Sequence, residues 1–292
     1  MGRIAVLGMG EMGSRVAQIL LRANHQVVVF NRTADKAKHL LSQGAIYASQ
    51  PREAAEQADV VISMVTDDEA SRAIWLAPET GAALGLGQDA IAIESSTLTV
   101  GWTKELAAAI ERRGAAFLDA PVVGSRPQAD AGKLIYLVGG EAENLATVQD
   151  ILLCAGTSIQ HVGSVGQGMA MKLAVNALFG VQVAALAELM GMLTKNGVSA
   201  SKALACLSEL PVLSPAAKGA GNLMLSNNHA PLFPIYLVEK DFRYSLQSAQ
   251  AVNAATPASV AIHKIYQAAI TEGYGDNNIT GIAKLFIPHS AA

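Results

Sequence analysis

The chain has few of the residues that mark several protein classes. It holds only two cysteines, Cys154 and Cys206, which lie far apart and form no C-x-x-C pair. Its six histidines are scattered, without the H-E-x-x-H spacing of a zinc site. These absences argue against a disulfide scaffold and against a metal site, and they favour a reduced, cytoplasmic protein.

Charge is scarce as well, since 15% of the residues are charged, the net charge is -3 at pH 7, and no basic run occurs. Binding nucleic acid requires clustered Lys and Arg, so no nucleic-acid partner is expected. The N-terminus shows no signal-peptide pattern. Residues 169–193 are apolar enough for a membrane helix but contain Lys172, Asn176, Gln182 and Glu188. Because charged groups are costly in a bilayer, we expect a buried helix of a soluble protein and no membrane partner.

Hydrophobic residues, in contrast, make up 51% of the 292 positions, enough for a sizeable core and for two domains. The first half alternates Val- and Ile-rich runs with helical patterns. Apolar runs without polar alternation are typical of strands covered on both faces, and strands separated by helices indicate βαβ units in a mainly parallel sheet. The expected strands are 3–8, 26–31, 58–65, 90–96, 115–122, 134–140 and 158–163.

From Gly166 onward the chain is rich in Ala, Leu and Met at helical spacing, and no strand-like run recurs. Helix stops are expected at 195–199, 210–215 and 229–234. The change in composition predicts an α/β domain over residues 1–163, followed by an all-helical domain over 164–292 that is entered through one long helix.

The stretch "RIAVLGMGEMGSRVA" places Gly8, Gly10 and Gly13 where a first strand ends and a helix begins, with Met9 and Met12 between them. In a dinucleotide-binding turn the first glycine permits the tight turn, the second admits the pyrophosphate, and the third lets the helix pack on the strand. The helix N-terminus then offers N–H groups to the phosphates. A purely structural turn of an α/β protein is the alternative.

The second strand ends in "FNRT", which supplies Asn31, Arg32 and Thr33. A site for NAD usually carries Asp or Glu there, and this carboxylate accepts hydrogen bonds from the adenosine ribose. Arg32 would instead attract a 2′-phosphate, and Asn31 and Thr33 could add hydrogen bonds to it. The strand end therefore favours NADP(H) over NAD(H), unless Arg32 is an ordinary surface arginine.

Lys172 and Asn176 lie four residues apart in "GSVGQGMAMKLAVNALFG" (163–180), so on a helix they share a face. Their surroundings are almost wholly apolar. A lysine held there must be paired, line a cleft or give up its proton more readily, because burial disfavours the charged form. Each of these situations suits a general acid/base. A lysine that extends to the surface beside a core asparagine is the structural alternative.

Four motifs together resemble the β-hydroxyacid dehydrogenases, the family of 3-hydroxyisobutyrate dehydrogenases, tartronate semialdehyde reductases and glyoxylate/succinic semialdehyde reductases. They are the cofactor turn "GMGEMG" (8–13), the substrate motif "DAPVVGS" (119–125), the catalytic motif "GSVGQGMAMKLAVN" (163–176) and the distal cofactor motif "KDFRYS" (240–245). The resemblance implies an N-terminal Rossmann domain with a doubly wound sheet, a long interdomain helix and an all-α C-terminal domain. It also implies a homodimer or homotetramer.

The same resemblance implies a role for each matching residue. Lys172 would be the general acid/base, and Asn176 would bind the substrate and position the lysine. Gly124 and Ser125 would hold the substrate carboxylate through backbone N–H groups and the Ser125 hydroxyl. The further positions expected at the cofactor are Val65, Thr66, Thr97 and Lys240, with Asp241 helping to hold it.

One residue departs from the family pattern, because Val123 stands where the family usually has Ser. The lost hydroxyl favours a substrate with an apolar group or one fewer polar contact, so the substrate itself cannot be named from the sequence. Arg126 beside it is either a second anion contact or a solvated loop residue. The departure at Val123 does not affect the hydride chemistry, which belongs to the cofactor.

The sequence thus predicts an oxidoreductase that transfers a hydride between NADP(H) and a small 3-hydroxyacid or a semialdehyde or 2-oxoacid carbonyl. An imine reductase shares the scaffold but usually lacks the lysine. A non-catalytic cofactor-binding module also loses it. A 6-phosphogluconate dehydrogenase has a similar Rossmann half, but its helical domain is longer and its substrate phosphate needs more basic residues.

Overall fold

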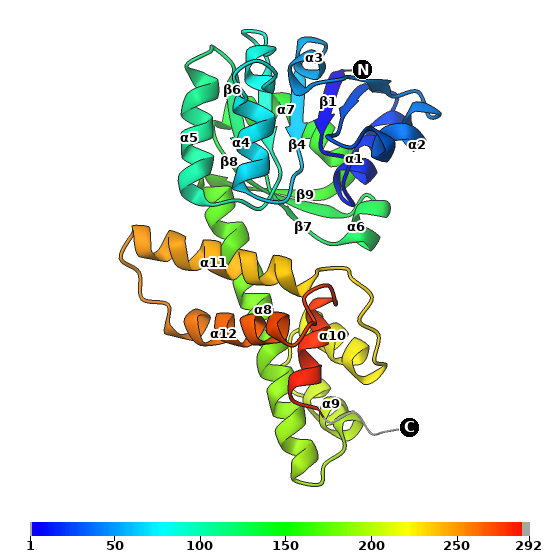
Figure 1. Cartoon of the computed structure of the whole chain (residues 1–292), viewed down its shortest axis with the longest axis vertical. Coiled ribbons are helices and arrows are strands. Elements are labelled where there is room, and N and C mark those ends of the chain that lie inside the picture. The colour runs from blue at the N-terminus through cyan, green and yellow to red at the C-terminus, as the bar shows by residue number, and fades with distance from the viewer. Residues whose placement is uncertain (1, 288–292) are drawn as a thin grey trace. The chain divides into compact units, whose positions relative to one another are not determined.

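The computed structural model describes residues 2–287, and its contacts divide the chain into two compact units between Lys172 and Leu173. The first unit contains the whole sheet, and the second contains helices only (Figure 1). The domain boundary predicted after residue 163 coincides with the end of the last strand. That residues 1–163 form an independent domain stays a prediction.

The sheet of the first unit has nine strands in the order β3-β2-β1-β4-β5-β6-β8-β7, with β9 paired to β8. The strands β3, β2, β1, β4, β5 and β6 run parallel, which is the strand order of a Rossmann fold and confirms the predicted fold class. Strand β8 is antiparallel to β6 and β7 and parallel to β9. The strands are β1 (Arg3–Leu7), β2 (Gln26–Phe30), β3 (Ile46–Tyr47), β4 (Val60–Ser63), β5 (Ile91–Glu94), β6 (Ala116–Asp119), β7 (Val122–Val123), β8 (Leu134–Gly139) and β9 (Gly156–Gly163).

Helices cover both faces of this sheet, as the apolar strand sequences require. One buried cluster contains Val16 of α1 and Val148 of α7, and the other contains Trp75 of α4 and Trp102 of α5. The helices are α1 (Gly13–Arg22), α2 (Lys38–Leu41), α3 (Pro51–Glu56), α4 (Asp68–Leu76), α5 (Val100–Glu111), α6 (Arg126–Asp130) and α7 (Ala142–Ala155), with short 3₁₀ segments η1 (Ala34–Ala37) and η2 (Ala82–Leu84).

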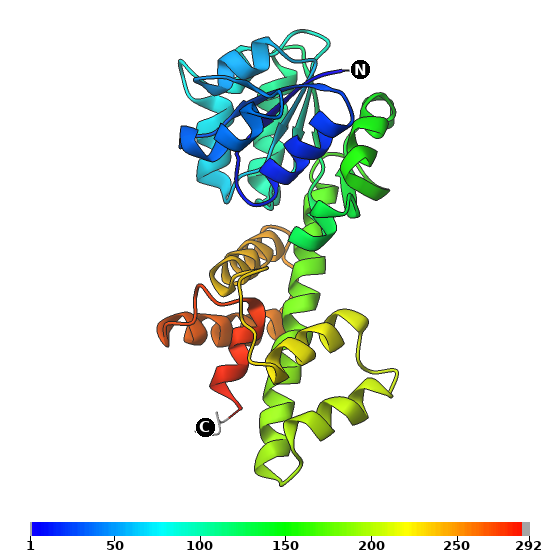
Figure 2. The same cartoon turned by 90° about the vertical axis from the view of Figure 1, so that its right-hand side faces the viewer.

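The second unit is all-helical in its described residues, as predicted (Figure 2). Helix α8 ends at the predicted stop 195–199, whereas α9 ends at Ser208 and α10 at Leu225, a few residues before the stops predicted at 210–215 and 229–234. Its core packs the α8 side chains of Val183 and Met190 with Phe242 of α11 and Tyr266 of α12. The Tyr266 hydroxyl donates to the Gly180 carbonyl at 2.9 Å. The helices are α8 (Gln167–Lys195), α9 (Ala200–Ser208), α10 (Pro215–Leu225), α11 (Ile235–Ala251) and α12 (Pro257–Thr271), followed by η3 (Ile279–Leu285).

Helix α8, which continues from the first unit into the second, is 29 residues long and passes a length-and-composition test for a membrane span. About two fifths of its most apolar window, 39%, is buried inside the protein. A single helix of this kind is weak evidence for a span, because core helices of soluble proteins pass the same test. The buried polar residues Lys172 and Asn176 lie on this helix.

Candidate functional site

The three glycines of the first turn have different reasons to be glycine. Gly8 has a φ of +102°, and a Cβ there would collide with the Met64 carbonyl oxygen. A Cβ on Gly13 would collide with the Gly8 carbonyl oxygen. A Cβ on Gly10 would meet no protein atom within 4 Å. The protein's own packing therefore requires Gly8 and Gly13, whereas no protein atom requires a glycine at position 10.

This turn is tied to the end of β2 by the side chain of Asn31. The Met9 N–H donates to Asn31 Oδ1 at 2.8 Å, and Asn31 Nδ2 donates to the Thr33 carbonyl at 2.8 Å. The amide thus holds the turn, a role that sequence reasoning did not assign to it. Arg32 and Thr33 are exposed, and no ion pair of Arg32 occurs among residues 2–287.

The loops after β4 and β5 are joined by a buried network around Glu94. Ser96 Oγ accepts the Val65 N–H at 2.7 Å, and the Ser96 N–H donates to Glu94 Oε1 at 3.0 Å. Glu94 Oε2 accepts bonds from Ser71 Oγ at 2.7 Å and Trp75 Nε1 at 2.9 Å. Burial raises the pKa of the Glu94 carboxyl, and these hydrogen bonds oppose the rise.

The network therefore fixes the two loops that carry Val65, Thr66 and Thr97. Sequence reasoning missed Glu94, although a charge inside the apolar run "AIAIESS" is the signal that could have found it. A fully buried carboxylate needs several donors, and the structure supplies them from α4 and from the strand's own end.

The substrate motif continues from β6 through the short strand β7 into α6. Gly124 is exposed and has a φ of +130°, a conformation that favours glycine. Ser125 caps α6 in a capping box, in which its N–H donates to Gln128 Oε1 at 3.0 Å. Val123 is half-buried beside them. The polar groups of Ser125 thus serve the helix start in this structure.

Arg126 forms an ion pair with Glu11 of the glycine turn, Nε to Oε2, at 3.3 Å. Glu11 also pairs with Arg15 at 2.8 Å, and Arg15 pairs with Asp130 at 2.7 Å. These exposed charges connect α1 with α6. The contact with Glu11 favours the surface role for Arg126 over a role in binding a substrate anion.

Lys172 and Asn176 are both buried, at 8% and 9% exposure, one helical turn apart on α8. Lys172 is the last residue of the first unit, and Asn176 belongs to the second. Asn176 Nδ2 donates to Asp241 Oδ2 at 2.6 Å. Because a carboxylate only accepts hydrogen bonds, this contact fixes the amide and turns Asn176 Oδ1, an acceptor, away from Asp241.

Lys240 is the residue before Asp241 on α11. Its Nζ is 3.3 Å from Asp241 Oδ1, and it stands 5.2 Å from the centre of the Tyr244 ring. The contact with Asp241 is an ion pair without hydrogen-bond alignment, because Asp241 Oδ1 has no hydrogen-bond partner. The structure thus brings together Asn176, Lys240 and Asp241 in the second unit, and the glycine turn with Asn31 in the first.

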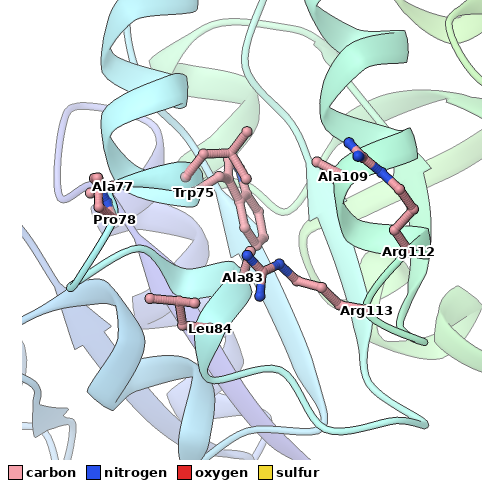
Figure 3. Close-up of a pocket in the computed structure, with 9 residues that line it drawn as sticks. Trp75, Ala77, Pro78, Ala83, Leu84, Ala109, Arg112 and Arg113 are labelled. Atoms are coloured by element: carbon pink, nitrogen blue, oxygen red, sulfur yellow. The ribbon is translucent and has the colours of Figure 1, made fainter.

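A hollow of about 410 Å³ lies elsewhere in the first unit, between α4, η2 and α5 (Figure 3). It contains none of the residues predicted for the site. Arg112 and Arg113 lie at its edge, and its walls are formed by small and apolar residues. Its lining is Trp75, Leu76, Ala77, Pro78, Ala83, Leu84, Ala109, Arg112 and Arg113. Within residues 2–287, no group of three His, Cys, Asp or Glu side chains is arranged to hold a metal.

Two family models match the chain. Residues 3–184 match the NAD binding domain of 6-phosphogluconate dehydrogenase. Residues 166–286 match the NAD-binding domain of NADP-dependent 3-hydroxyisobutyrate dehydrogenase. Together they cover both units.

Individual proteins resemble the chain over its whole length. Glyoxylate/succinic semialdehyde reductase 2 of Arabidopsis thaliana is 32% identical over 96% of this chain and 78% of its own length. The NAD-dependent L-serine dehydrogenase of Pseudomonas aeruginosa is 31% identical over 99% of both chains. A solved structure of Mycobacterium tuberculosis 3-hydroxyisobutyrate dehydrogenase with L-serine has a TM-score of 0.86 at 28% identity, over 98% of this chain and 99% of that one.

Proposed function

Because the chain belongs to the β-hydroxyacid dehydrogenase family, we propose that it is an NADP(H)-dependent enzyme that interconverts a small 3-hydroxyacid and its semialdehyde, or reduces a related 2-oxoacid. The family itself establishes an oxidoreductase that uses a nicotinamide dinucleotide and acts on a small molecule. The cofactor preference, the substrate and the residue roles are our proposal. The observation that carries it is a buried lysine one helical turn from a buried, oriented asparagine.

In this proposal, residues of α8 handle the proton while the bound nicotinamide supplies or accepts the hydride. Lys172 gives a proton to the carbonyl oxygen during reduction and removes it from the hydroxyl during oxidation. Asn176 presents Oδ1, because Asp241 holds its Nδ2. An acceptor there suits a substrate hydroxyl or the Lys172 ammonium group.

For the cofactor, we assign the pyrophosphate to the space over Gly10 and the 2′-phosphate to Arg32. The support for Arg32 is its place directly after Asn31 at the end of β2, its exposure and its lack of an ion pair among residues 2–287. A carboxylate, which an NAD site usually carries there, does not occur at residues 31–33. Val65, Thr66, Thr97 and Lys240 complete the proposed cofactor contacts.

For the substrate, we assign the carboxylate to the Gly124 backbone, since the exposed N–H of a glycine at positive φ can face an anion. The Ser125 groups would have to leave the capping box to take part. Val123 offers no hydroxyl, so the preferred substrate carries an apolar substituent, as a 2-methyl semialdehyde does, rather than a second hydroxyl group.

The test is NADPH oxidation with glyoxylate, succinic semialdehyde, tartronate semialdehyde, methylmalonate semialdehyde and a cyclic imine. We expect rapid turnover of a semialdehyde by the native protein and only a small residual rate by Lys172→Ala, which should still bind NADPH. Arg32→Ala should weaken NADPH at least about tenfold and NADH hardly at all. Turnover of the imine alone, or full activity of Lys172→Ala, would refute the proposed reaction.

We also propose that the protein is a cytoplasmic homodimer or homotetramer that uses the exposed face of α8. Leu178 is 61% exposed, Leu189 43% and Met192 50%, and the spacing places them on one side of the helix with Ala185. A second copy of the chain is the occupant that this mostly apolar face, which also carries Gln182, suits. Leu178→Asp with Leu189→Asp should reduce the molecular mass found by light scattering, whereas an unchanged mass would refute the assignment.

A further inference from the structure

Asp119 opens the 119–125 motif and has no role in the proposed chemistry. It ends β6, and its side chain is fully buried. Its Oδ1 accepts the Gly166 N–H at 2.7 Å, and its Oδ2 accepts the Met169 N–H at 2.7 Å. Both donors belong to the start of α8, where N–H groups have no partner within the helix. A carboxylate on a strand therefore caps the long helix from outside.

Glycines let this helix start lie directly on the sheet. Gly139 of β8 stands opposite Asp119 in the sheet, and a Cβ on it would be 2.5 Å from Asp119 Oδ1. A Cβ on Gly168 would be 2.5 Å from the Leu137 carbonyl oxygen and 2.9 Å from Asp119 Oδ2. All three distances are too short for a real Cβ, so the contact between the helix start and the sheet requires glycine at both positions as well as the Asp119 carboxylate.

The same helical turn is joined to the loop after β5. The Leu98 N–H donates to the Met169 thioether sulfur at 3.2 Å, and Met169 is fully buried. Thr97, one of the proposed cofactor contacts, is the preceding residue. Lys172 follows Met169 by three residues and so lies on the same side of α8. The first turn of the helix therefore connects the lysine to β6 and to the β5 loop.

We propose that Asp119 is a positioning residue: by fixing the first turn of α8, it holds Lys172 at a set position relative to the loop that carries Thr97. This inference rests on the proposed function of Lys172. A carboxylate is required because both partners are donors, whereas an amide would offer one acceptor and one competing donor. The negative charge also lies at the positive end of the α8 dipole.

The electrostatic surroundings of Asp119 fit a carboxylate held by donors. Burial raises the pKa of its carboxyl, while the Gly166 and Met169 N–H bonds and the charge of Lys104 on α5 oppose the rise. Lys104 also lies close to the start of α8, since its Cε would be 3.0 Å from a Cβ on Gly166.

The test is a double-mutant cycle between Asp119→Asn and Lys172→Ala. In the native background, Asp119→Asn should lower kcat by about ten- to a hundredfold, the cost of a small misplacement of a catalytic group, and leave the Kd for NADPH nearly unchanged. In the Lys172→Ala background, the same change should lower the residual rate no further. Ser199→Ala, which removes the α9 cap that accepts the Lys202 N–H at 3.3 Å, is the control for lost stability and should keep kcat.

Met169→Leu is the second variant, because it keeps the volume and removes only the sulfur acceptor, so it should fold even where Asp119→Asn does not. It should show a smaller loss of kcat that also vanishes in the Lys172→Ala background. Equal losses in both backgrounds, or a native kcat for Asp119→Asn, would overturn the positioning role. Full activity of Lys172→Ala alone would instead refute the proposed function, whatever the Asp119 variant does.

Discussion

Replacing Gly10 by alanine should separate cofactor binding from folding. Its Cβ would enter space that holds no protein atom within 4 Å, and its φ lies outside the left-handed region. Gly→Ala at a compatible position stabilises by about 0.4–1 kcal/mol through the unfolded chain. The Gly10→Ala protein without cofactor should therefore unfold at the same temperature as the native protein or slightly above it.

Cofactor binding should respond in the opposite direction, because the new methyl group occupies the place assigned to the pyrophosphate. We expect affinity for NADPH to fall at least about tenfold, which corresponds to ~1.4 kcal/mol. At a hundred times its Kd, a ligand stabilises the folded state by about 2.7 kcal/mol. NADPH should thus raise the unfolding temperature of the native protein by several degrees, and this gain should shrink clearly in Gly10→Ala.

Gly8→Ala is the matched control at the other end of the turn. Its positive φ and the collision with the Met64 carbonyl should destabilise the protein with or without cofactor. Thermal melts of the three proteins with and without NADPH measure their unfolding temperatures, and NADPH titration by fluorescence measures the Kd. Native NADPH affinity in Gly10→Ala would refute the assignment of the pyrophosphate to this turn.

Three other changes test other parts of the structure. The pKa of Glu94 is raised in the folded state, so its ionisation costs stability. The native protein should therefore lose stability relative to Glu94→Gln as the pH rises from 4.5, the ordinary pKa of a glutamate, through the folded-state pKa. A difference in Tm between the two proteins that stays constant with pH would contradict this. Asp241→Asn lets the Asn176 amide turn over, so KM for the substrate should rise about tenfold or more, and the Tm should fall because the change removes a negative charge beside the buried Lys240. An unchanged KM would show that the orientation of the amide is unimportant. Gly180→Ala places a methyl group 2.5 Å from Phe242 Cε2 and should lower the free energy of unfolding in urea by about 1–3 kcal/mol. A urea midpoint equal to that of the native protein would contradict this.

Most of the architecture follows from local sequence patterns. The apolar runs predicted all seven strands longer than two residues among those described, because strands covered on both faces are apolar throughout; β9, most of whose residues are half-buried or exposed, is the exception to this reason. The two-residue strands β3 and β7 were not predicted separately, since they are too short for any periodicity. Helix α1 begins only at the last glycine of the motif, Gly13, because the positive φ of Gly8 and the turn after it precede the helix.

The candidate site could be predicted only in part, because a motif identifies residues without their partners. Asn31 was assigned to a phosphate, yet its amide is engaged by Met9 and Thr33, and only the fold brings those groups together. Glu94 and Asp119 lie in the sequence as isolated acids within apolar runs. Their donors come from segments up to 50 residues away, as with Met169 and Asp119.

The bond between the Met9 N–H and Asn31 Oδ1 has a consequence for the evolution of coenzyme choice. Aspartate at position 31 would retain the oxygen that holds the glycine turn, but its second oxygen would face the Thr33 carbonyl oxygen, which now accepts the NH₂ group at 2.8 Å, so that part of the loop would have to shift. The same replacement would introduce the carboxylate that accepts ribose hydroxyls and repels a 2′-phosphate. Under the proposed preference for NADP(H), a change of coenzyme through position 31 therefore requires the Thr33 carbonyl to turn away as well as one side-chain atom to change.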